Sequence, residues 1–201
     1  MVTAAVSGAV ISTLGRPLGS QVVCATSDTA ARIDEIQIDL GEGPSWQALR
    51  TRLPVLEADL RHVRGSAWPG ALEALRKLDI GALFAFPLFV GDLGVGSVDL
   101  YSHDPRQLSQ SAVDDVAVLA TVAARHLLRC ALDELDHVEE GMTGGPYSRR
   151  DMHQAAGMIA VQLTIGVGDA LLVLRARAFS TGRSVAEISL DVVARRLSFA
   201  L

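Results

Sequence analysis

Alternating apolar and polar positions in the first hundred residues predict an antiparallel β-sheet. Residues 4–14 and 20–26 have the pattern of two strands joined by a short turn. The strongest pattern lies at 82–101, where two apolar runs are separated by Gly91 and Asp92, a pair typical of tight hairpin turns. The sequence therefore predicts two hairpins in this part of the chain.

Further helix and strand signals lie between these hairpins. Residues 28–38 predict a short helix, and 40–51 predict a glycine-bearing loop that opens another. Residues 55–59 have a strand-like composition, and 69–79 form an amphipathic pattern with Pro69 suited to its first turn. The predicted fold class is α+β, an antiparallel sheet with flanking helices.

A long apolar stripe predicts one helix from about residue 110 to residue 140. Its members recur at three- and four-residue steps and are Val113, Val116, Ala120, Ala124, Leu127, Ala131, Leu135 and Val138. The stripe lasts for about four heptads, which is long for a helix of a globular domain. Two explanations stay open, namely packing on the chain's own sheet and parallel pairing with a second copy. We favour the pairing, so the sequence predicts a homodimer.

A glycine-rich break at 141–146 follows the long helix and marks a domain boundary. After it, the apolar pattern predicts three short amphipathic helices, at 150–164, 167–181 and 185–199. The first predicted domain includes the long helix and is followed by a linker and a helical domain, with bounds of 1–135, 136–147 and 148–201.

Capping signals mark the ends of the helices in the second domain. Ser148 and Asp151 have the spacing of a capping box, and Ser184 with Glu187 forms a full S-x-x-E box. Gly182 supplies a helix stop just before the second box. These signals favour separate helices over one continuous helix.

The second domain is basic, whereas the rest of the chain is acidic. From residue 147 on there are seven arginines against four acidic residues, while the whole chain carries a formal charge of −5, so residues 1–146 carry −8. A small basic helical module on an acidic carrier is expected of a protein that binds a polyanion. An aromatic content of 4% argues against a mode in which single-stranded bases stack on exposed rings.

The sequence lacks the motifs that are typical of several function classes. The chain has no nucleophile-elbow, phosphate-loop or metal-ligand motif, so we expect neither an enzyme nor a metal or cofactor site. Cys24 and Cys130 lie far apart and are expected to be buried thiols in a reducing compartment. No signal peptide and no run of about 18 uncharged apolar residues is visible, so we expect a cytoplasmic protein.

The string from 153 to 197 resembles the ANTAR domain, a three-helix RNA-binding module of bacterial transcription antiterminators. The matching features are Q-A-x-G-M at 154–158, Ala170, and L-R-x-x-A at 174–178. Ala156 stands where the family often has lysine. This variant of the motif resembles the actinobacterial branch of the family.

The first part of the chain resembles a GAF domain. The segments that carry the resemblance are GEGPSWQALRT at 41–51, PVLEADL at 54–60, WPG at 68–70 and FAFPLFVGDLGVGSVDLYS at 84–102. Ser45 stands where the family often has cysteine, so thiol chemistry is not expected there. The resemblance implies a GAF-like sheet that acts as a sensor, as a dimerisation domain, or as both.

Together the two resemblances imply a GAF and ANTAR domain-containing regulator of transcription antitermination. ANTAR modules bind paired small stem-loops in nascent transcripts and keep a terminator hairpin from forming. A dimer carries two modules, which can hold two adjacent loops at once. The helix at 110–140 is the expected transmitter of a signal, because a pair of helices can change register or splay.

The candidate RNA contacts are basic, polar and glycine positions of the second domain, namely Arg149, Arg150, Gln154, Gly157, Arg175, Arg177 and Arg183. Gly157 has two interpretations, which are close approach of RNA and close packing of helices, because a mid-helix glycine costs about 1 kcal/mol. Arg175 and Arg177 point about 200° apart on a helix. One of them is therefore expected to pair with an acid such as Asp169 or Asp191.

The candidate ligand pocket of the GAF-like domain lies at the loop 41–46, where Trp46 and Trp68 would stack on a small ligand. The alternative is that both tryptophans are core or lid residues. Two other functions also stay open. One is a ligand-sensing or protein-interaction scaffold that binds no RNA, and the other is a DNA-binding factor with one short recognition helix.

Overall fold

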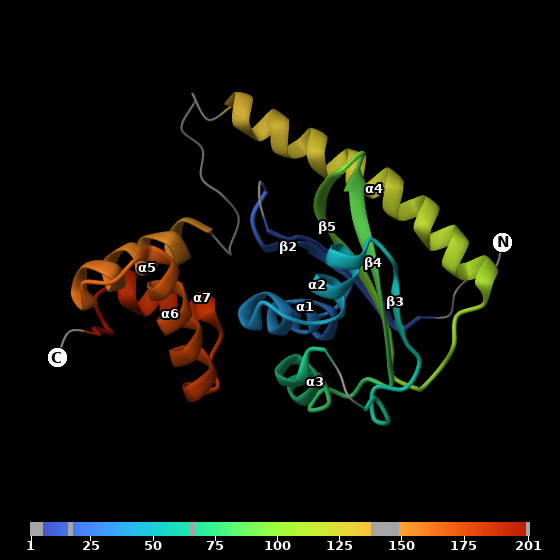
Figure 1. Ribbon diagram of the computed structural model, residues 1–201, viewed down its shortest axis with the longest axis horizontal. Helices are drawn as coiled ribbons and strands as arrows, with labels where there is room; N and C mark the ends of the chain where they lie inside the picture. The colour runs from blue at the N-terminus through green and yellow to red at the C-terminus, as the bar shows by residue number, and fades with distance from the viewer. Residues whose placement is uncertain (1–5, 16–17, 65–66, 138–148, 200–201) are drawn as a thin grey trace. The chain divides into compact units, whose positions relative to one another are not determined.

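Two compact units make up the chain in the computed structural model, and the division falls between residues 142 and 143 (Figure 1). We call them the sheet unit (1–142) and the helical unit (143–201). The structure describes the backbone of residues 6–15, 18–64, 67–137 and 149–199, and among these it does not describe the side chains of 133–137 and 149–150. The predicted break at 141–146 and the predicted cap at Ser148 lie outside the described residues.

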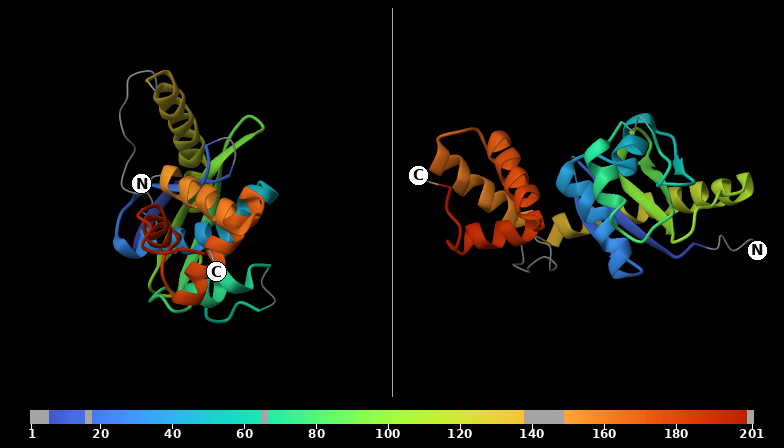
Figure 2. Two further views of the ribbon diagram at one scale, coloured as in Figure 1. Left: turned by 90° about the vertical axis from the view of Figure 1, so that its left-hand side faces the viewer. Right: turned by 90° about the horizontal axis from the view of Figure 1, so that it is seen from below.

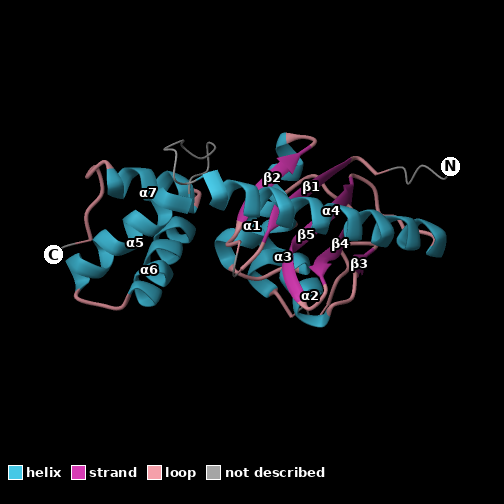
Figure 3. Cartoon of the chain, turned by 90° about the horizontal axis from the view of Figure 1, so that it is seen from above, coloured by secondary structure: helices cyan, strands magenta, loops and turns pink. Residues whose placement is uncertain are grey.

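An antiparallel sheet with the strand order β2-β1-β5-β4-β3 forms the centre of the sheet unit (Figure 3). Its strands are β1 (Gly8–Thr13), β2 (Gln21–Ala25), β3 (Val55–Glu57), β4 (Ala82–Val90) and β5 (Leu93–Ser102). The turn between β4 and β5 begins at Gly91, which has a φ of 59°. Both predicted hairpins, and the antiparallel sheet, are confirmed.

Helices cover both faces of this sheet. They are α1 (Asp28–Leu40), α2 (Pro44–Thr51), α3 (Pro69–Leu75) and α4 (Gln110–His137). Successive side chains of a strand point to opposite faces, so Leu83 of β4 packs with α1 and α3, whereas Phe84 packs with α4. The sheet unit therefore has two cores, one on each face.

The apolar stripe of α4 packs on the sheet of its own chain. Ala120, Ala124 and Leu127 are buried in one cluster with Phe84 and Phe86 of β4. The prediction that this stripe pairs with a second copy is wrong for these residues, and the alternative that we left open describes them. Residues 138–140 of the predicted helix lie outside the described residues.

The third helix, α3, is shorter than the predicted helix at 69–79. After Leu75 the amide of Leu78 donates to the carbonyl of Leu75, three residues back instead of four, so the α-helix gives way to a turn. The Arg76 guanidinium donates to backbone carbonyls of the segment 60–63 and holds this turn in place.

The helical unit consists of α5 (Arg149–Leu163), α6 (Val167–Thr181) and α7 (Val185–Val193) in the described residues. Small side chains let the three helices meet in one core, whose fully buried members include Ala155, Ile159, Leu174 and Ile188. The three predicted helices are therefore present.

Two of the predicted helix signals are observed as hydrogen bonds. The Ser184 hydroxyl accepts from the Glu187 amide, and the Glu187 carboxylate accepts from the Ser184 amide, which completes the capping box. Gly182 ends α6 with a φ of 65°, as its position in the sequence predicts.

The last helix is shorter than its predicted span of 185–199, because α7 ends at Val193. Arg195 takes a left-handed conformation with a φ of 57°, and the Arg196 amide donates to the Asp191 carbonyl oxygen at 2.7 Å. The chain therefore turns away from the helix axis. The segment after α7 is tied to α5, because the Phe199 amide donates to the side-chain oxygen of Gln162 (Figure 2).

Candidate functional sites

A groove with a volume of about 640 Å³ lies on the helical unit. Residues of α5 and of the segment after α7 line it, and they are Gln154, Gly157, Met158, Val161, Gln162, Arg195, Leu197 and Ser198. The segment after α7 reaches α5 because α7 ends at Val193 and the Phe199 amide donates to the side-chain oxygen of Gln162. The groove combines apolar side chains with amide, hydroxyl and guanidinium groups.

Gly157 faces open space within this groove. A Cβ atom built at Gly157 meets no atom within 4 Å outside its own helix turn and neighbours. The interpretation of Gly157 as a site of close helix packing is therefore wrong. Gln154 lies three residues away on the same helix face, so two of the predicted RNA contacts share one groove.

None of the predicted arginine contacts whose side chains are described lines this groove. Arg175 on α6 is half-buried and Arg177 is exposed, and neither lines the groove. The side chains of Arg149 and Arg150, at the start of α5, are not described. Arg195, which was not among the predicted contacts, lines the groove, because its place depends on a left-handed turn that the helical pattern did not predict.

Asp191 pairs with two arginines other than those expected. Arg183 Nη2 donates to Asp191 Oδ2 at 2.8 Å, and Arg196 Nε donates to Asp191 Oδ1 at 2.8 Å. The expected pairing of Arg175 or Arg177 with an acid such as Asp169 or Asp191 is not found among the described residues. The hydrogen bonds from Arg183 and Arg196 lower the pKa of the Asp191 carboxyl.

A second candidate site is a buried polar cluster between the sheet and α1. Its centre is Asp99 of β5, whose Oδ2 accepts from Gln37 Nε2 at 2.6 Å and from the Ser45 hydroxyl at 2.5 Å. The Ser45 amide donates to Gln37 Oε1 at 2.9 Å. Gly43 has a φ of 140°, and a side chain there would collide with Gln37. The loop before α2 therefore needs this glycine to close over the cluster.

Asp34 of α1 extends the polar cluster toward β1. Its Oδ1 accepts from the Ser12 hydroxyl at 2.9 Å, and the Ser12 and Ser97 hydroxyl oxygens lie 3.4 Å apart. Asp34 Oδ2 has no hydrogen-bond partner among the described residues. Asp99 Oδ1 has no hydrogen bond of good geometry there either, although the nearby Ser97 hydroxyl favours the charged form of Asp99.

Burial controls the charge of these two carboxyl groups. Burial, and then the negative charge of Asp99, raise the pKa of Asp34 to about 8, while the hydrogen bond from Ser12 opposes that rise. Burial raises the pKa of Asp99 to about 6, and the hydrogen bonds from Ser45 and Gln37 oppose it. Both carboxyl groups therefore keep a proton more readily than an exposed aspartate does, and Asp34 does so more strongly than Asp99.

The sequence analysis did not single out these acids. Asp99 lies between Val98 and Leu100 in a strand with small residues on both faces, and Asp34 lies next to Ile33 and Glu35 in a helix with many charges. Asp99 could have been found from the sequence, because it is an acidic residue inside an apolar strand. The alternation of side chains along that strand places it on a covered face of the sheet.

The two tryptophans of the predicted ligand pocket have different environments. Trp68 is 1% exposed and belongs to the core with α1 and α3, so neither ring face is open to a ligand. Its indole nitrogen donates to Gln47 Oε1 at 2.7 Å. Trp46 is half-buried, and its indole nitrogen donates to the Gln37 carbonyl oxygen at 2.8 Å. The prediction of Trp68 as a stacking residue is wrong, and the core alternative describes it.

The cysteines are not buried as the sequence analysis expected. Cys24 is exposed on the edge strand β2, and Cys130 is half-exposed on α4; both are free thiols. An edge strand has no neighbour on one side, so a short apolar residue there can face solvent. In the described part of the chain, no three His, Cys, Asp or Glu side chains gather as a metal site.

Residues 3–127 match the sequence model of the GAF domain family. This segment is more than half of the chain, so the chain belongs to the GAF domain family. The five strands and α1 to α3, with Gly43 before α2 and Ser45 in the first turn of α2, lie within the matched segment, which ends inside α4. The match supports a role in signal sensing for the sheet unit. No curated protein matches the sequence.

Solved structures of GAF domains are similar to the sheet unit. One is the cyanobacteriochrome TePixJ GAF domain, with 19% identity, a TM-score of 0.48, and coverage of 63% of this chain and 80% of that chain. Another is GAF3 from Slr1393 of Synechocystis sp. PCC6803, with 14% identity, a TM-score of 0.46, and coverage of 67% and 87%. A third is the GAF-B domain of DevS from Mycobacterium smegmatis, with 14% identity, a TM-score of 0.46, and coverage of 65% and 86%. All three TM-scores are below 0.5, so the family assignment rests on the sequence match.

No single helix among the described residues is both long and apolar enough to cross a membrane. The pair formed by residues 151–163 and 167–181 passes that test by length and composition when its two helices are taken together, and it is bent by 104°.

Proposed function

We propose that this protein is a cytoplasmic, signal-responsive RNA-binding regulator that acts by transcription antitermination at paired stem-loops in nascent RNA. The sheet unit senses a signal, and the helical unit binds RNA without enzymatic chemistry. The observation that carries this proposal is the groove in which Gln154 and Gly157, both in the segment that resembles the ANTAR domain, lie beside Arg195.

The groove has the chemistry that an RNA loop requires. Bases in loops are unstacked, and proteins recognise them by stacking and by hydrogen bonds to their edges. Gln154, Gln162 and Ser198 supply donors and acceptors, while Met158 and Val161 supply apolar contacts. The open space at Gly157 lets a base or a sugar approach the α5 backbone.

Arginines outside the groove are suited to the phosphate backbone. Arg177 is exposed on α6, and Arg149 and Arg150 lie in the first turn of α5. Contacts to phosphate fix the position of the protein on RNA, whereas contacts to bases provide specificity. Binding should therefore depend strongly on salt through the arginines and on loop sequence through the groove.

Two copies of the helical unit would bind two adjacent stem-loops. A homodimer makes the second contact intramolecular, so its effective concentration raises the overall affinity without any new contact. A signal that reaches the sheet unit would then change how the two helical units are presented.

Direct binding to a defined RNA tests the proposal. Fluorescence anisotropy of an RNA with two adjacent short stem-loops should give an affinity that falls steeply with salt. The triple variant R149A/R150A/R177A should bind at least about tenfold more weakly and show a shallower salt slope, by about 0.7 to 0.9 for each phosphate contact that is lost. Arg64→Ala removes an exposed arginine of the sheet unit and should change neither value.

Three outcomes separate the candidate functions. Equal affinity of the wild type and the triple variant would reject the assigned arginines. Tighter binding to duplex DNA than to hairpin RNA would indicate a DNA-binding factor. Absence of salt-sensitive binding to either nucleic acid would favour a ligand-sensing scaffold, a function that the unpartnered oxygen of Asp34 in the GAF domain supports on its own.

A further inference from the structure

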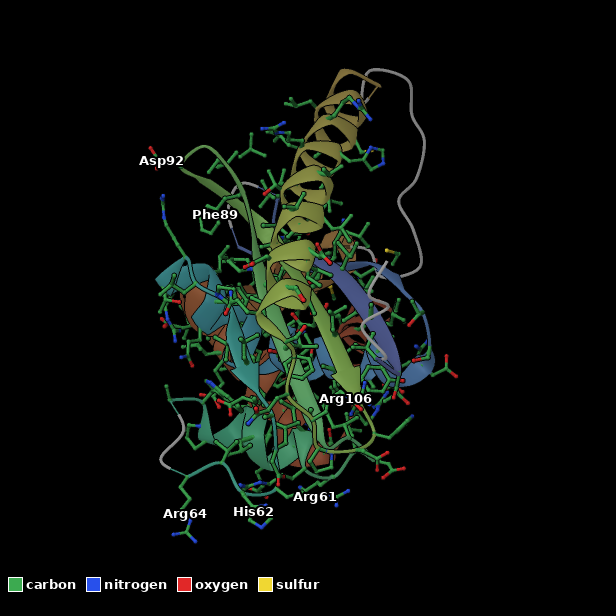
Figure 4. The ribbon with its side chains drawn as sticks, turned by 90° about the vertical axis from the view of Figure 1, so that its right-hand side faces the viewer. Arg61, His62, Arg64, Phe89, Asp92 and Arg106 are labelled. Carbon is green, nitrogen blue, oxygen red and sulfur yellow. The ribbon has the colours of Figure 1, made fainter. Side chains whose placement is uncertain are left out.

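One face of α4 carries large apolar side chains that no part of the described sheet unit covers (Figure 4). Val118 and Leu119 are each 65% exposed, Val122 is 61% exposed and Leu132 is 52% exposed. Val118 and Val122 lie on the side of α4 opposite Ala120, Ala124 and Leu127, which pack on the sheet. Leu119 and Leu132 lie on either side of the two valines. Neighbouring exposed apolar side chains of this size mark a surface suited to contact with a partner.

Charged residues flank this face in a specific order. Asp115, Val118, Val122, Arg125 and Arg129 follow one another at steps of three and four residues and therefore share one face of the helix. All five are exposed. The acid lies toward the N-terminal end of α4, the two valines lie in the middle, and the arginines lie toward the C-terminal end. We call these five residues the α4 stripe.

We propose that a second copy of this chain covers the α4 stripe in an antiparallel arrangement. A two-fold axis between Val118 and Val122 sets Val118 against the partner's Val122. The same axis sets Asp115 opposite the partner's Arg125. A two-fold interface repeats each contact, so the dimer contains two such charge pairs. The dimer thus has an apolar centre between two pairs of opposite charges.

The charge order disfavours the parallel alternative. In a parallel pair, Asp115 would lie beside the partner's Asp115, and each arginine of the stripe would lie beside its own copy. Like charges at an interface disfavour association, whereas opposite charges also set the orientation of the partners. The parallel pairing expected from the sequence used the residues that pack on the sheet. The proposed dimer therefore differs from that expectation in both the face and the direction of the helices.

This inference rests on the proposed function, which requires a dimer, and it adds the interface and the orientation of the two chains. The two-fold axis lies about 17 residues before the end of α4, so the C-terminal ends of the two α4 helices lie about 50 Å apart along the helix axis at about 1.5 Å per residue. The two chains therefore continue toward their helical units from opposite ends of the helix pair.

Cysteine cross-linking of the full chain tests the orientation. Cys24→Ser and Cys130→Ser first remove the native thiols. The variants D115C and R125C are then prepared in this background and oxidised, each alone and as an equal mixture. An antiparallel dimer cross-links only in the mixture, whereas a parallel dimer cross-links each variant with itself, and that result would overturn the proposal.

A second experiment tests the stripe as the interface. Val122→Glu should raise the dimer dissociation constant at least tenfold in sedimentation equilibrium, and the control Ala117→Glu, exposed on another side of α4, should not. D115R and R125D should each weaken the dimer, and D115R/R125D should restore it. Circular dichroism confirms that each variant is folded. A wild-type monomer, or a dimer that Val122→Glu leaves intact, would reject the α4 stripe.

These outcomes are distinct from failure of the proposed function. Binding of one isolated stem-loop involves one helical unit, so Val122→Glu should leave that affinity unchanged while it weakens binding of the paired stem-loops. If neither RNA binds but the cross-linking pattern is antiparallel, the dimer stands and RNA binding does not.

Discussion

Asp34 and Asp99 come from different elements, α1 and β5, and meet in the buried interior of the sheet unit, where the negative charge of Asp99 helps to keep Asp34 protonated. Each accepts a hydroxyl hydrogen bond on one oxygen, from Ser12 in the case of Asp34 and from Ser45 in the case of Asp99. Two buried carboxyl groups in one polar cluster make the stability of the sheet unit depend on pH.

The free energy of unfolding should fall as the pH rises from about 4 to about 8. The pKa of Asp34 is about 8 in the folded state, above its ordinary value of 3.8. The unfolded chain therefore releases a proton in this window that the folded chain keeps, and each such proton lowers stability by at most about 1.4 kcal/mol per pH unit. Asp34→Asn removes this proton and should make the dependence shallower, most clearly between pH 6 and 8.

Tryptophan fluorescence during urea unfolding measures this effect, because both tryptophans of the chain, Trp46 and Trp68, lie in the sheet unit. Asp104→Asn, at an exposed position, is the matched control and should retain the wild-type slope. A wild-type slope in Asp34→Asn would mean that Asp34 is charged in the folded protein.

Gly96→Ala should destabilise the sheet unit by about 2 to 4 kcal/mol, as expected for overpacking of a fixed site. A Cβ atom at Gly96 would collide with the carbonyl oxygen of Ser12 on the neighbouring strand β1, and a backbone atom in a central pair of strands does not yield easily. The same fluorescence experiment detects the loss. Gly94→Ala on the same strand meets the movable side chain of Leu49 and should cost less; an equal cost at both positions would contradict this explanation.

Gly157→Ala separates stability from recognition in the helical unit. The added methyl group enters open space, so it should stabilise α5 by about 0.5 to 1 kcal/mol through helix propensity alone. If RNA approaches the backbone at Gly157, the same variant should bind RNA more weakly. Amide hydrogen exchange of α5 and the anisotropy titration provide the two readouts. Slower exchange with unchanged RNA affinity would remove Gly157 from the binding site.

Ser184→Ala should increase local opening of α7. The Ser184 hydroxyl accepts from the Glu187 amide in the capping box, and loss of such a cap costs about 1 kcal/mol. Hydrogen exchange of the α7 amides in the full chain measures the change. Ser180→Ala removes an exposed hydroxyl that bonds only to its own helix backbone, so it should leave α7 unchanged. Equal protection of α7 in both variants would show that the cap does not limit its opening.

The order of strands and helices could be predicted from the sequence wherever a local signal exists. The β4–β5 hairpin follows from its two apolar runs around Gly91, and the start of α7 follows from the capping box at Ser184. Helix ends without a local signal were placed wrongly. The end of α7 depends on the left-handed turn at Arg195, after which the chain returns to α5. The apolar pattern of the sequence does not predict this turn.

The environment of a helix face could not be predicted from periodicity. Both sides of α4 carry apolar residues, so the pattern gave the helix but did not distinguish the side that packs on the sheet from the side marked by Val118 and Val122. The same limit applies to Trp68 and Gly157, whose roles depend on contacts between distant segments. Only the folded chain brings Asp34 and Asp99 into one cluster.

The carboxylate of Asp191 has a consequence for how salt acts on this protein. Asp191 binds Arg183 before α7 and Arg196 after it, so one half-buried carboxylate holds both ends of the helix next to Arg195 and Leu197 of the groove. Ions screen pairs that are open to solvent, and the side chains of Arg183 and Arg196 are 42% and 64% exposed. Rising salt is therefore expected to weaken both ion pairs, and with them the wall of the groove that Arg195 and Leu197 form. This effect is a property of the protein alone, and it would lower the affinity for the proposed RNA in addition to the competition of salt ions at the phosphates.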